Sequence, residues 1–255
     1  MSLTSAVIKF AVPLPRIEDY NSYLFIGPHP DDIEIGAGAT AAKLAANGKK
    51  VSFLICIDGR FGTSNSDLSP EQMIEVRKEE SVKSALKLGV TDVHFLDLCD
   101  GGFYTEEELL EGIAKTVGEV CPDIVFAPDP DVSSECHRDH LNVGRAAKQI
   151  AVFAPYYNIM ARYGAKSADV KAIAMYMTAK PNRYVNTAGF LEKQLDSVFN
   201  THFSQFPEGC NDAKSISLYL KLRSFQHGIR AGSKSGEGFR VLGTTHMHCL
   251  PEAGR

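Results

Sequence analysis

The chain has 255 residues, of which 44% are hydrophobic and 23% charged, and its formal net charge is −4. This composition is typical of a folded globular protein and excludes a wholly disordered chain. Lysine and arginine are scattered without a basic stripe or a polybasic run, which argues against nucleic acid and anionic lipid as partners. The sequence contains no stretch of about 18 apolar residues, the length that would predict a membrane-spanning helix. Small molecules are therefore the expected partners.

The six cysteines form no C-x-x-C pair, and most of them lie in or beside apolar runs, where free thiols commonly pack. The segment 1–10 has neither the long apolar region nor the cleavage site of a signal peptide. Both observations favour a protein of the reducing cytoplasm with free thiols.

Predicted strands and helices alternate along the first two-thirds of the chain. Apolar runs that end at turn-forming residues predict strands, and periodic runs bounded by proline, acids or glycine predict helices. The predicted strands are residues 23–27, 51–57, 93–98 and 124–127, and the predicted helices are residues 35–47, 70–88, 106–120 and 137–150. Further on, the pattern loosens and predicts a fifth strand at 171–178, helices at 190–203 and 212–230, and a loop at 232–238.

This alternation predicts an α/β fold, because right-handed crossovers place helices on both faces of a parallel sheet. We expect a Rossmann-like, mostly parallel twisted sheet with helices on both faces, plus a C-terminal α+β extension. The expected organisation is a single domain over residues 1–255. Its core, at about 20–150, carries the chemical motifs, and the extension, at about 151–255, shapes the substrate pocket.

Two clusters of histidine and aspartate follow the first and the fourth predicted strands. They are His29-Pro30-Asp31-Asp32 and His137-Arg138-Asp139-His140. In a doubly wound sheet of order 3-2-1-4, the first and fourth strands are neighbours where the winding reverses, and ligands bind outside their carboxyl ends. The two clusters are therefore expected to face each other.

Imidazole and carboxylate together suit Zn²⁺, and a catalytic zinc typically takes three protein ligands and keeps one position open. His29, Asp32 and His140 would supply that set, and Fe²⁺ is compatible with the same ligands. Asp31 is then the remaining acid beside the metal. It is a candidate general base, because zinc lowers the pKa of a bound water to about 7.

His137 lies three residues before His140, so both side chains are expected on one side of the first helical turn. We expect His137 to face the substrate carbonyl, where it stabilises the developing oxyanion or protonates the leaving amine. Asp139 is expected to orient a neighbouring imidazole. The pattern indicates an acyl-transfer site without a protein nucleophile.

The two motifs, with the small-residue helix start at 34–40 between them, resemble the LmbE/PIG-L family of zinc-dependent N-acetylglucosamine deacetylases. The resemblance covers about residues 23–150, with supporting features at 75–80, 202–205 and 237–239. Ile33 stands between the two aspartates and Glu34, as in the branch that resembles bacillithiol-pathway deacetylases. The role of Glu34 stays open.

The resemblance implies an amino-sugar substrate that loses its N-acetyl group by hydrolysis. It also implies the roles of six residues, with His29, Asp32 and His140 as metal ligands, Asp31 as general base, and His137 with Asp139 as the transition-state pair. Arg77 resembles the family's helix-borne arginine near the substrate. The alternative for Arg77 is a surface ion pair with Glu80, three residues further along the same helix.

Three loops, at 58–69, 128–135 and 232–238, are expected to form the rim of the pocket, with Arg60 as a substrate contact. His246 and His248 alternate in a β-like segment, as a second metal pair would, but two ligands without a third favour structural or exposed histidines. Apolar and aromatic residues at 152–157 mark a candidate interface, and we expect a homo-oligomer.

Two other functions stay open at this point. Two histidines and one carboxylate also form the facial triad of non-haem Fe(II) oxygenases, although such triads usually sit on all-β jelly rolls. A non-catalytic sugar- or nucleotide-binding module predicts a missing ligand or base, and none is missing. The glycines at 36 and 38 do not complete a dinucleotide-binding motif, because Ala41 stands where a third glycine is needed.

Overall fold

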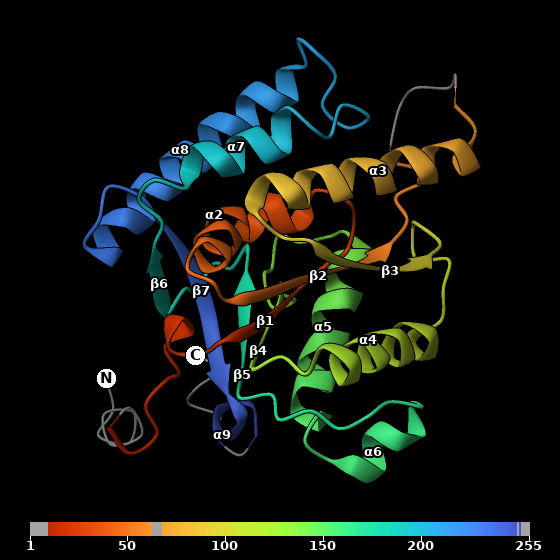
Figure 1. Ribbon diagram of the computed structural model, residues 1–255, viewed down its shortest axis with the longest axis vertical. Helices are drawn as coiled ribbons and strands as arrows, with labels where there is room; N and C mark the ends of the chain where they lie inside the picture. Colours follow the sequence, from red (N-terminus) through yellow and green to blue (C-terminus); the bar gives the residue numbers. More distant parts are fainter. Residues whose placement is uncertain (1–9, 63–67, 249, 251–255) are drawn as a thin grey trace.

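The structure, a computed structural model, describes residues 10–62, 68–248 and 250. Its centre is a seven-stranded sheet of order β3-β2-β1-β4-β5-β7-β6 (Figure 1). Strands β1 to β5 all run parallel to one another, whereas β7 is antiparallel to both β5 and β6. The predicted mostly parallel sheet is confirmed, including the order 3-2-1-4 of its first four strands.

The elements have the following bounds. The strands are β1 (Ser22–Gly27), β2 (Lys50–Ile57), β3 (Asp92–Leu98), β4 (Ile124–Pro128), β5 (Ala172–Tyr176), β6 (Arg183–Asn186) and β7 (Gly236–Gly243). The helices are the 3-10 helix η1 (Ile17–Asp19), α2 (Asp32–Ala46), α3 (Pro70–Leu88), α4 (Glu106–Val120), α5 (Arg138–Phe153), α6 (Tyr157–Arg162), α7 (Leu191–Phe199), α8 (Asn211–Ala231) and α9 (Thr244–Met247). Within the described ranges, no helix is long and apolar enough to cross a membrane.

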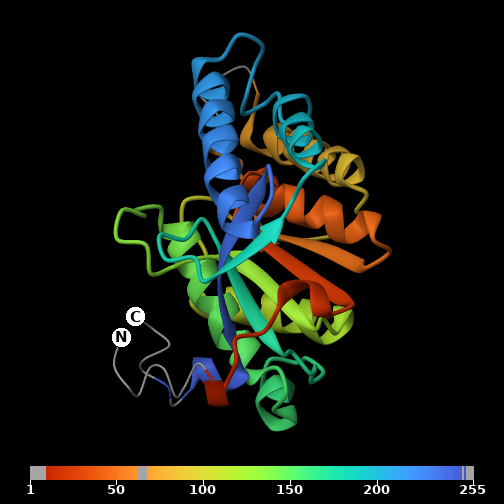
Figure 2. The same cartoon turned by 90° about the vertical axis from the view of Figure 1, so that its left-hand side faces the viewer.

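Helices cover both faces of the sheet, and the apolar core lies in two layers between them and the strands. Helices α2, α3, α7 and α8 lie on one side, and α4 and α5 on the other (Figures 1 and 2). Alternate residues of β1 enter opposite layers, with Leu24 and Ile26 on the α4 and α5 side and Tyr23 and Phe25 on the α2 side. Because both faces of this strand are buried, its sequence is a continuous apolar run.

The C-terminal part differs most from the sequence-based prediction. The strand β6 was not predicted, and the predicted loop 232–238 is wrong at its end, because its last three residues begin β7. His246 lies in the short helix α9 rather than in a β-like segment. Hydrogen bonding of β7 to strands on both sides outweighs the weak strand preference of its glycines.

A kink divides α2, the helix that begins at Asp32. Ala37 has φ −152° and ψ 15°, which are not helical values. At the start of the second half, the carboxylate of Glu237 on β7 accepts hydrogen bonds from the backbone N–H groups of Ala39 (3.1 Å) and Thr40 (2.7 Å). These bonds satisfy donors that the kink frees, so the C-terminal extension stabilises the helix that carries part of the site.

Five cysteines of the described residues are free thiols. Cys56 is buried, as the sequence indicated, but Cys121 and Cys136 are exposed. Cys249 lies outside the described residues.

Candidate metal centre and active site

Two neighbouring parallel strands place the histidine and aspartate clusters side by side. β1 and β4 pair in register from Tyr23 opposite Ile124, and each cluster follows the carboxyl end of its strand. Asp31 is the N-terminal capping residue of α2, and His137 is that of α5. The two helix starts therefore meet at the point where the winding of the sheet reverses.

His29, Asp32 and His140 form a group that can hold a metal ion, which we call the metal group. Their ligand atoms all lie within 4.8 Å of one another. Oδ2 of Asp32 is 3.3 Å from Nδ1 of His29 and 3.3 Å from Nε2 of His140. Although burial opposes ionisation, the two histidines hold the pKa of Asp32 well below its usual range. Two imidazole nitrogens and one carboxylate are a donor set that suits zinc or iron.

The other ring nitrogen of His29 faces two carboxylates. Nε2 of His29 lies 3.2 Å from Asp139 and 3.3 Å from Asp100. Asp139 is fully buried and also accepts hydrogen bonds from the Gly101 N–H (3.0 Å) and the Tyr104 hydroxyl (2.9 Å). A carboxylate behind a ligating histidine fixes the ring and its tautomer. Asp100 was missed by the sequence analysis, although it follows the carboxyl end of β3.

His137 lies beside this group and contacts Asp139 mainly through the backbone of that residue. Its Nδ1 accepts the backbone N–H of Asp139 at 3.3 Å and is 3.9 Å from the Asp139 carboxylate. The imidazole that Asp139 contacts closely is that of His29. About half of the His137 side chain is exposed, and its ring is 4.9 Å from that of His29, centroid to centroid. His137 is therefore free to contact a ligand.

Asp31 lies next to the metal group in a strained turn. Its φ of 108° is in the left-handed region, which is uncommon for a residue other than glycine and is often found at functional sites. Burial raises the pKa of its carboxyl to about 6, and the charge of Arg77 opposes that shift. A cation bound nearby would lower this pKa as well.

Arg77 is buried against the turn that carries Asp31. Its guanidinium donates to the carbonyl oxygens of Pro30 (2.8 Å) and Gly59 (3.1 Å) and lies 3.6 Å from the Asp31 carboxylate. The alternative surface ion pair with Glu80 is wrong, because Glu80 instead accepts hydrogen bonds from Ser204. Arg77 thus links α3 to the active-site turn.

We expect the substitution Arg77→Ala to lower the free energy of unfolding by about 1–3 kcal/mol, because it leaves buried carbonyl groups without donors. Urea unfolding measures this change. Lys83→Ala is the matched control on the same helix, since Lys83 forms a solvent-exposed ion pair with Glu79, and such pairs contribute little to stability. Equal losses in the two variants would contradict a structural link through Arg77.

A cavity of about 360 Å³ opens onto these residues. Arg60 is not part of its lining, and its guanidinium pairs with Asp58 at 2.6 Å. A direct contact between Arg60 and a substrate stays a prediction, and residues 63–67 of the predicted rim loop lie outside the described residues. The lining residues are His29, Asp31, Asp32, Ile35, Gly62, Arg77, Asp100, His137, His140, Gln205, Phe206, Asp212 and Ile216.

The role of Glu34 was left open by the sequence. Its side chain is buried, and it does not belong to the metal group. Its carboxylate lies 3.4 Å from Nε2 of the fully buried His202, and its backbone carbonyl accepts a hydrogen bond from Gln194 at 2.8 Å. These contacts join the first turn of α2 to α7 and to the segment that follows it. Glu34 therefore contributes to the position of Asp32.

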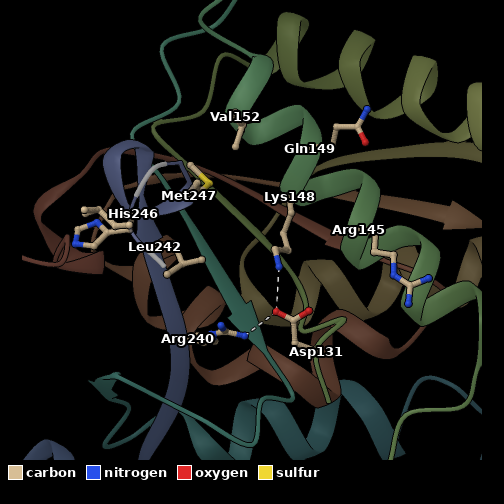
Figure 3. A pocket seen from close by; sticks show the side chains of 10 residues that line it. Asp131, Arg145, Lys148, Gln149, Val152, Arg240, Leu242, His246 and Met247 are labelled. Carbon is tan, nitrogen blue, oxygen red and sulfur yellow. Dashed lines mark hydrogen bonds and ion pairs between the residues drawn. The ribbon is translucent and has the colours of Figure 1, made fainter. Parts of the chain in front are cut away.

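A larger cavity of about 690 Å³ lies between α5, β7 and α9 (Figure 3). It is larger than the cavity beside His29, Asp32 and His140, but none of these three residues lines it. Asp131 there pairs with Lys148 (3.0 Å) and Arg240 (2.8 Å). His246 lines this cavity and contacts the Val12 carbonyl at 3.0 Å. Among the described residues, neither His246 nor His248 belongs to a group that could hold a metal ion.

The site lies at the switch point of a parallel α/β sheet, where the metal group lies beside the buried carboxylate of Asp31. Residues 24–151 match the family model described as PIG-L: GlcNAc-PI de-N-acetylase, and the chain belongs to this family. It is 34% identical to a diacetylchitobiose deacetylase of Thermococcus kodakarensis over 241 residues, which cover 92% of this chain and 88% of that protein.

A second relative is a 1D-myo-inositol 2-acetamido-2-deoxy-alpha-D-glucopyranoside deacetylase of Kineococcus radiotolerans. It is 29% identical over 206 residues, which cover 69% of this chain and 56% of that protein. The prediction of the family is confirmed, and the finer placement in a bacillithiol-type branch stays a prediction.

Solved structures with the same fold include an N,N'-diacetylchitobiose deacetylase from Pyrococcus horikoshii. The TM-score is 0.87 at 30% identity, over 98% of this chain and 97% of that one. A 4-carboxy-2-hydroxymuconate hydratase from Pseudomonas putida also matches, with a TM-score of 0.73 at 17% identity, over 87% of this chain and 96% of that one. The fold alone therefore does not define the reaction.

Proposed function

We propose that this protein is a metal-dependent N-deacetylase that hydrolyses the acetamide of an N-acetylglucosamine unit. The observation that carries the proposal is the grouping of His29, Asp32 and His140 beside Asp31 on a cavity wall. The names of both relatives support it, because each describes a deacetylase of an N-acetylated glucosamine compound. Zn²⁺ is the proposed ion, and Fe²⁺ suits the same donors.

The three donors would hold the ion and leave a coordination position open. When bound, the ion supplies a water of lowered pKa and polarises the acetamide carbonyl. The Asp100 and Asp139 carboxylates would accept a hydrogen bond from the Nε2–H of His29, which leaves Nδ1 of the ring unprotonated beside Asp32. This tautomer is the one that a metal ligand requires.

Asp31 would act as the general base. It lies in the same turn as Asp32 but contributes no atom to the metal group, so its carboxylate is available to take a proton from the attacking water. Arg77 holds the turn through the Pro30 carbonyl and lies 3.6 Å from the Asp31 carboxylate. Both contacts fix the base in one position.

His137 would donate a proton or a hydrogen bond to the reacting acetamide. Because its Nδ1 accepts the Asp139 backbone N–H, the neutral ring carries its proton on Nε2. The side chain lines the cavity and is about half exposed. The Nε2–H can therefore stabilise the developing oxyanion, whereas protonation of the leaving amine uses either the imidazolium form of this ring or the proton that Asp31 has taken from the water.

A second cavity, of about 370 Å³, adjoins the catalytic one and suits a second ring of the substrate. Both cavities are lined by Ile35 and by α8, and the second one reaches Glu135, which lies 3.4 Å from His140. The substrates named for the two relatives, a disaccharide and an inositol glycoside, both carry a second ring. We propose a substrate of this size.

Tyr219 in the second cavity is half exposed and offers a surface on which a sugar ring can stack. We expect Tyr219→Ala to raise KM for N,N'-diacetylchitobiose about fivefold, equivalent to about 1 kcal/mol, and to leave KM for N-acetylglucosamine unchanged. Tyr157→Ala, at an exposed tyrosine that lines neither cavity, is the control. An equal rise in KM for both substrates would contradict a contact between Tyr219 and the second sugar ring.

The release of acetate from N,N'-diacetylchitobiose and from N-acetylglucosamine tests the proposed reaction. The proposal predicts stoichiometric acetate and free amine, with faster turnover of the two-ring compound. Binding of either sugar without acetate release would instead support the non-catalytic module. Oxygen consumption without acetate release would support the iron oxygenase.

A further inference from the structure

The long helix α8 carries four of its large apolar side chains on the face that points to solvent. Four large apolar residues are each more than half exposed, whereas the buried positions of the same helix are mostly small or polar. A surface helix of a monomer normally shows the reverse arrangement. The exposed residues are Leu218 (59%), Leu222 (60%), Phe225 (62%) and Ile229 (64%), and the buried ones are Leu220, Ser224, His227 and Gly228.

The exposed residues form one continuous stripe, which we call the α8 stripe (Leu218, Leu222, Phe225 and Ile229). Their spacings are 4, 3 and 4 residues, which is the pattern of a coiled-coil seam. The pattern is the same in both directions along the chain. A second copy of the helix, running antiparallel, therefore matches the stripe at every position.

We infer that the protein forms a symmetric dimer in which α8 packs antiparallel on α8 of a second copy. A two-fold axis near the middle of the helix places Leu222 against the partner's Phe225 and Leu218 against the partner's Ile229. The stripe presents on the order of 500 Å² of apolar surface, the range in which exposed patches are often functional. This is more than half of the roughly 800 Å² per partner in a standard interface.

The charges beside the α8 stripe are compatible with this pairing. In the antiparallel register, Lys221 lies opposite the partner's Gln226, and Arg230 lies opposite the partner's Ser217, so basic side chains do not meet across the seam. An anionic membrane is the other surface that an apolar and basic helix can bind. The net charge of −4 and the symmetric spacing favour a second copy.

The proposed dimer contact lies on a helix that also lines the catalytic cavity. The helix lies at the periphery of the molecule in both views (Figures 1 and 2), and residues on its other faces line both cavities. Asp212 and Ile216 line the catalytic cavity, and Leu220 lines the second one. The inference of a dimer itself does not depend on the proposed reaction.

Light scattering coupled to size-exclusion chromatography tests the dimer on the wild-type protein and on two variants, Leu222→Lys and Phe225→Glu. We expect twice the chain mass of 27.8 kDa, or an even multiple of it, for the wild type, and at most half of the wild-type mass for each variant. Leu86→Glu, at an exposed leucine (53%) on α3, is the matched control and should keep the wild-type mass.

An equimolar mixture of the two variants tests the antiparallel register. In each mixed pair, the lysine introduced at position 222 of one chain lies opposite the glutamate introduced at position 225 of the other. The second contact of the same pair keeps an unchanged leucine opposite an unchanged phenylalanine. Because each introduced charge then faces one of opposite sign, we expect the mixture to regain the wild-type mass.

Three results would overturn the inference. They are a wild-type protein at 27.8 kDa, variants with the wild-type mass, and a mixture that stays dissociated although circular dichroism shows both variants folded. A monomeric wild type that sediments with phosphatidylserine vesicles would assign the stripe to a membrane surface instead.

Discussion

Replacing Asp31 with asparagine is expected to lower kcat by about 10²–10⁴ and to leave the bound metal in place, because a general base typically contributes that factor. Asparagine keeps the size of the side chain but cannot take the proton of the attacking water. The metal group contains no atom of Asp31, so its ligands are unchanged. Acetate-release kinetics and the metal content of the purified variant measure the two effects separately.

Asp212→Asn is the matched control for this substitution. Asp212 is an exposed carboxylate on the wall of the same cavity and belongs to no metal-type group of the described residues. We expect its kcat to stay within a few-fold of the wild-type value. An Asp31→Asn variant that turns over substrate at the wild-type rate would show that another group removes the proton.

Asp32→Ala is expected to abolish metal binding and, with it, measurable acetate release. The carboxylate of Asp32 lies 3.3 Å from both His29 and His140, so its removal takes away the atom that joins the two imidazoles. Elemental analysis of the purified variant after dialysis measures the loss. Retention of one equivalent of metal by Asp32→Ala would contradict the ligand assignment.

Glu135→Gln serves as the graded comparison. Glu135 lies 3.4 Å from Nδ1 of His140, on the far side of the ring from Asp32. Loss of such a supporting contact typically weakens metal binding by about 10–100-fold without abolishing it. We therefore expect Glu135→Gln to bind metal more weakly than the wild type and more tightly than Asp32→Ala, in a competition titration with a chelator.

The parallel core of the fold was predictable because its strands are buried on both faces. Continuous apolar runs such as 23–27 and 51–57 have few other interpretations when helical segments separate them. The strand β7 was missed because Gly236 and Gly238 are locally typical of a loop. Their lack of side chains instead permits close packing against α8, since a Cβ atom on Gly238 would lie 2.8 Å from the His227 ring.

The candidate site was partly predictable for the same reason. His29, Asp32 and His140 follow two strands that the topology makes neighbours, so the sequence alone brings them together. Arg77 was ambiguous because its acceptors, the Pro30 and Gly59 carbonyls, belong to loops whose path no local pattern defines. The spacing of Arg77 and Glu80 on one helix suggested an exposed pair, but tertiary contacts bury both side chains.

Metal-dependent release of acetate is the most direct test of the proposed function. The wild-type protein is treated with a chelator, dialysed, and assayed with N,N'-diacetylchitobiose before and after single metals are restored. We predict that chelation abolishes acetate release and that Zn²⁺ or Fe²⁺ at one equivalent restores it. Acetate release at the full rate from protein shown to be free of metal would contradict the central role of His29, Asp32 and His140.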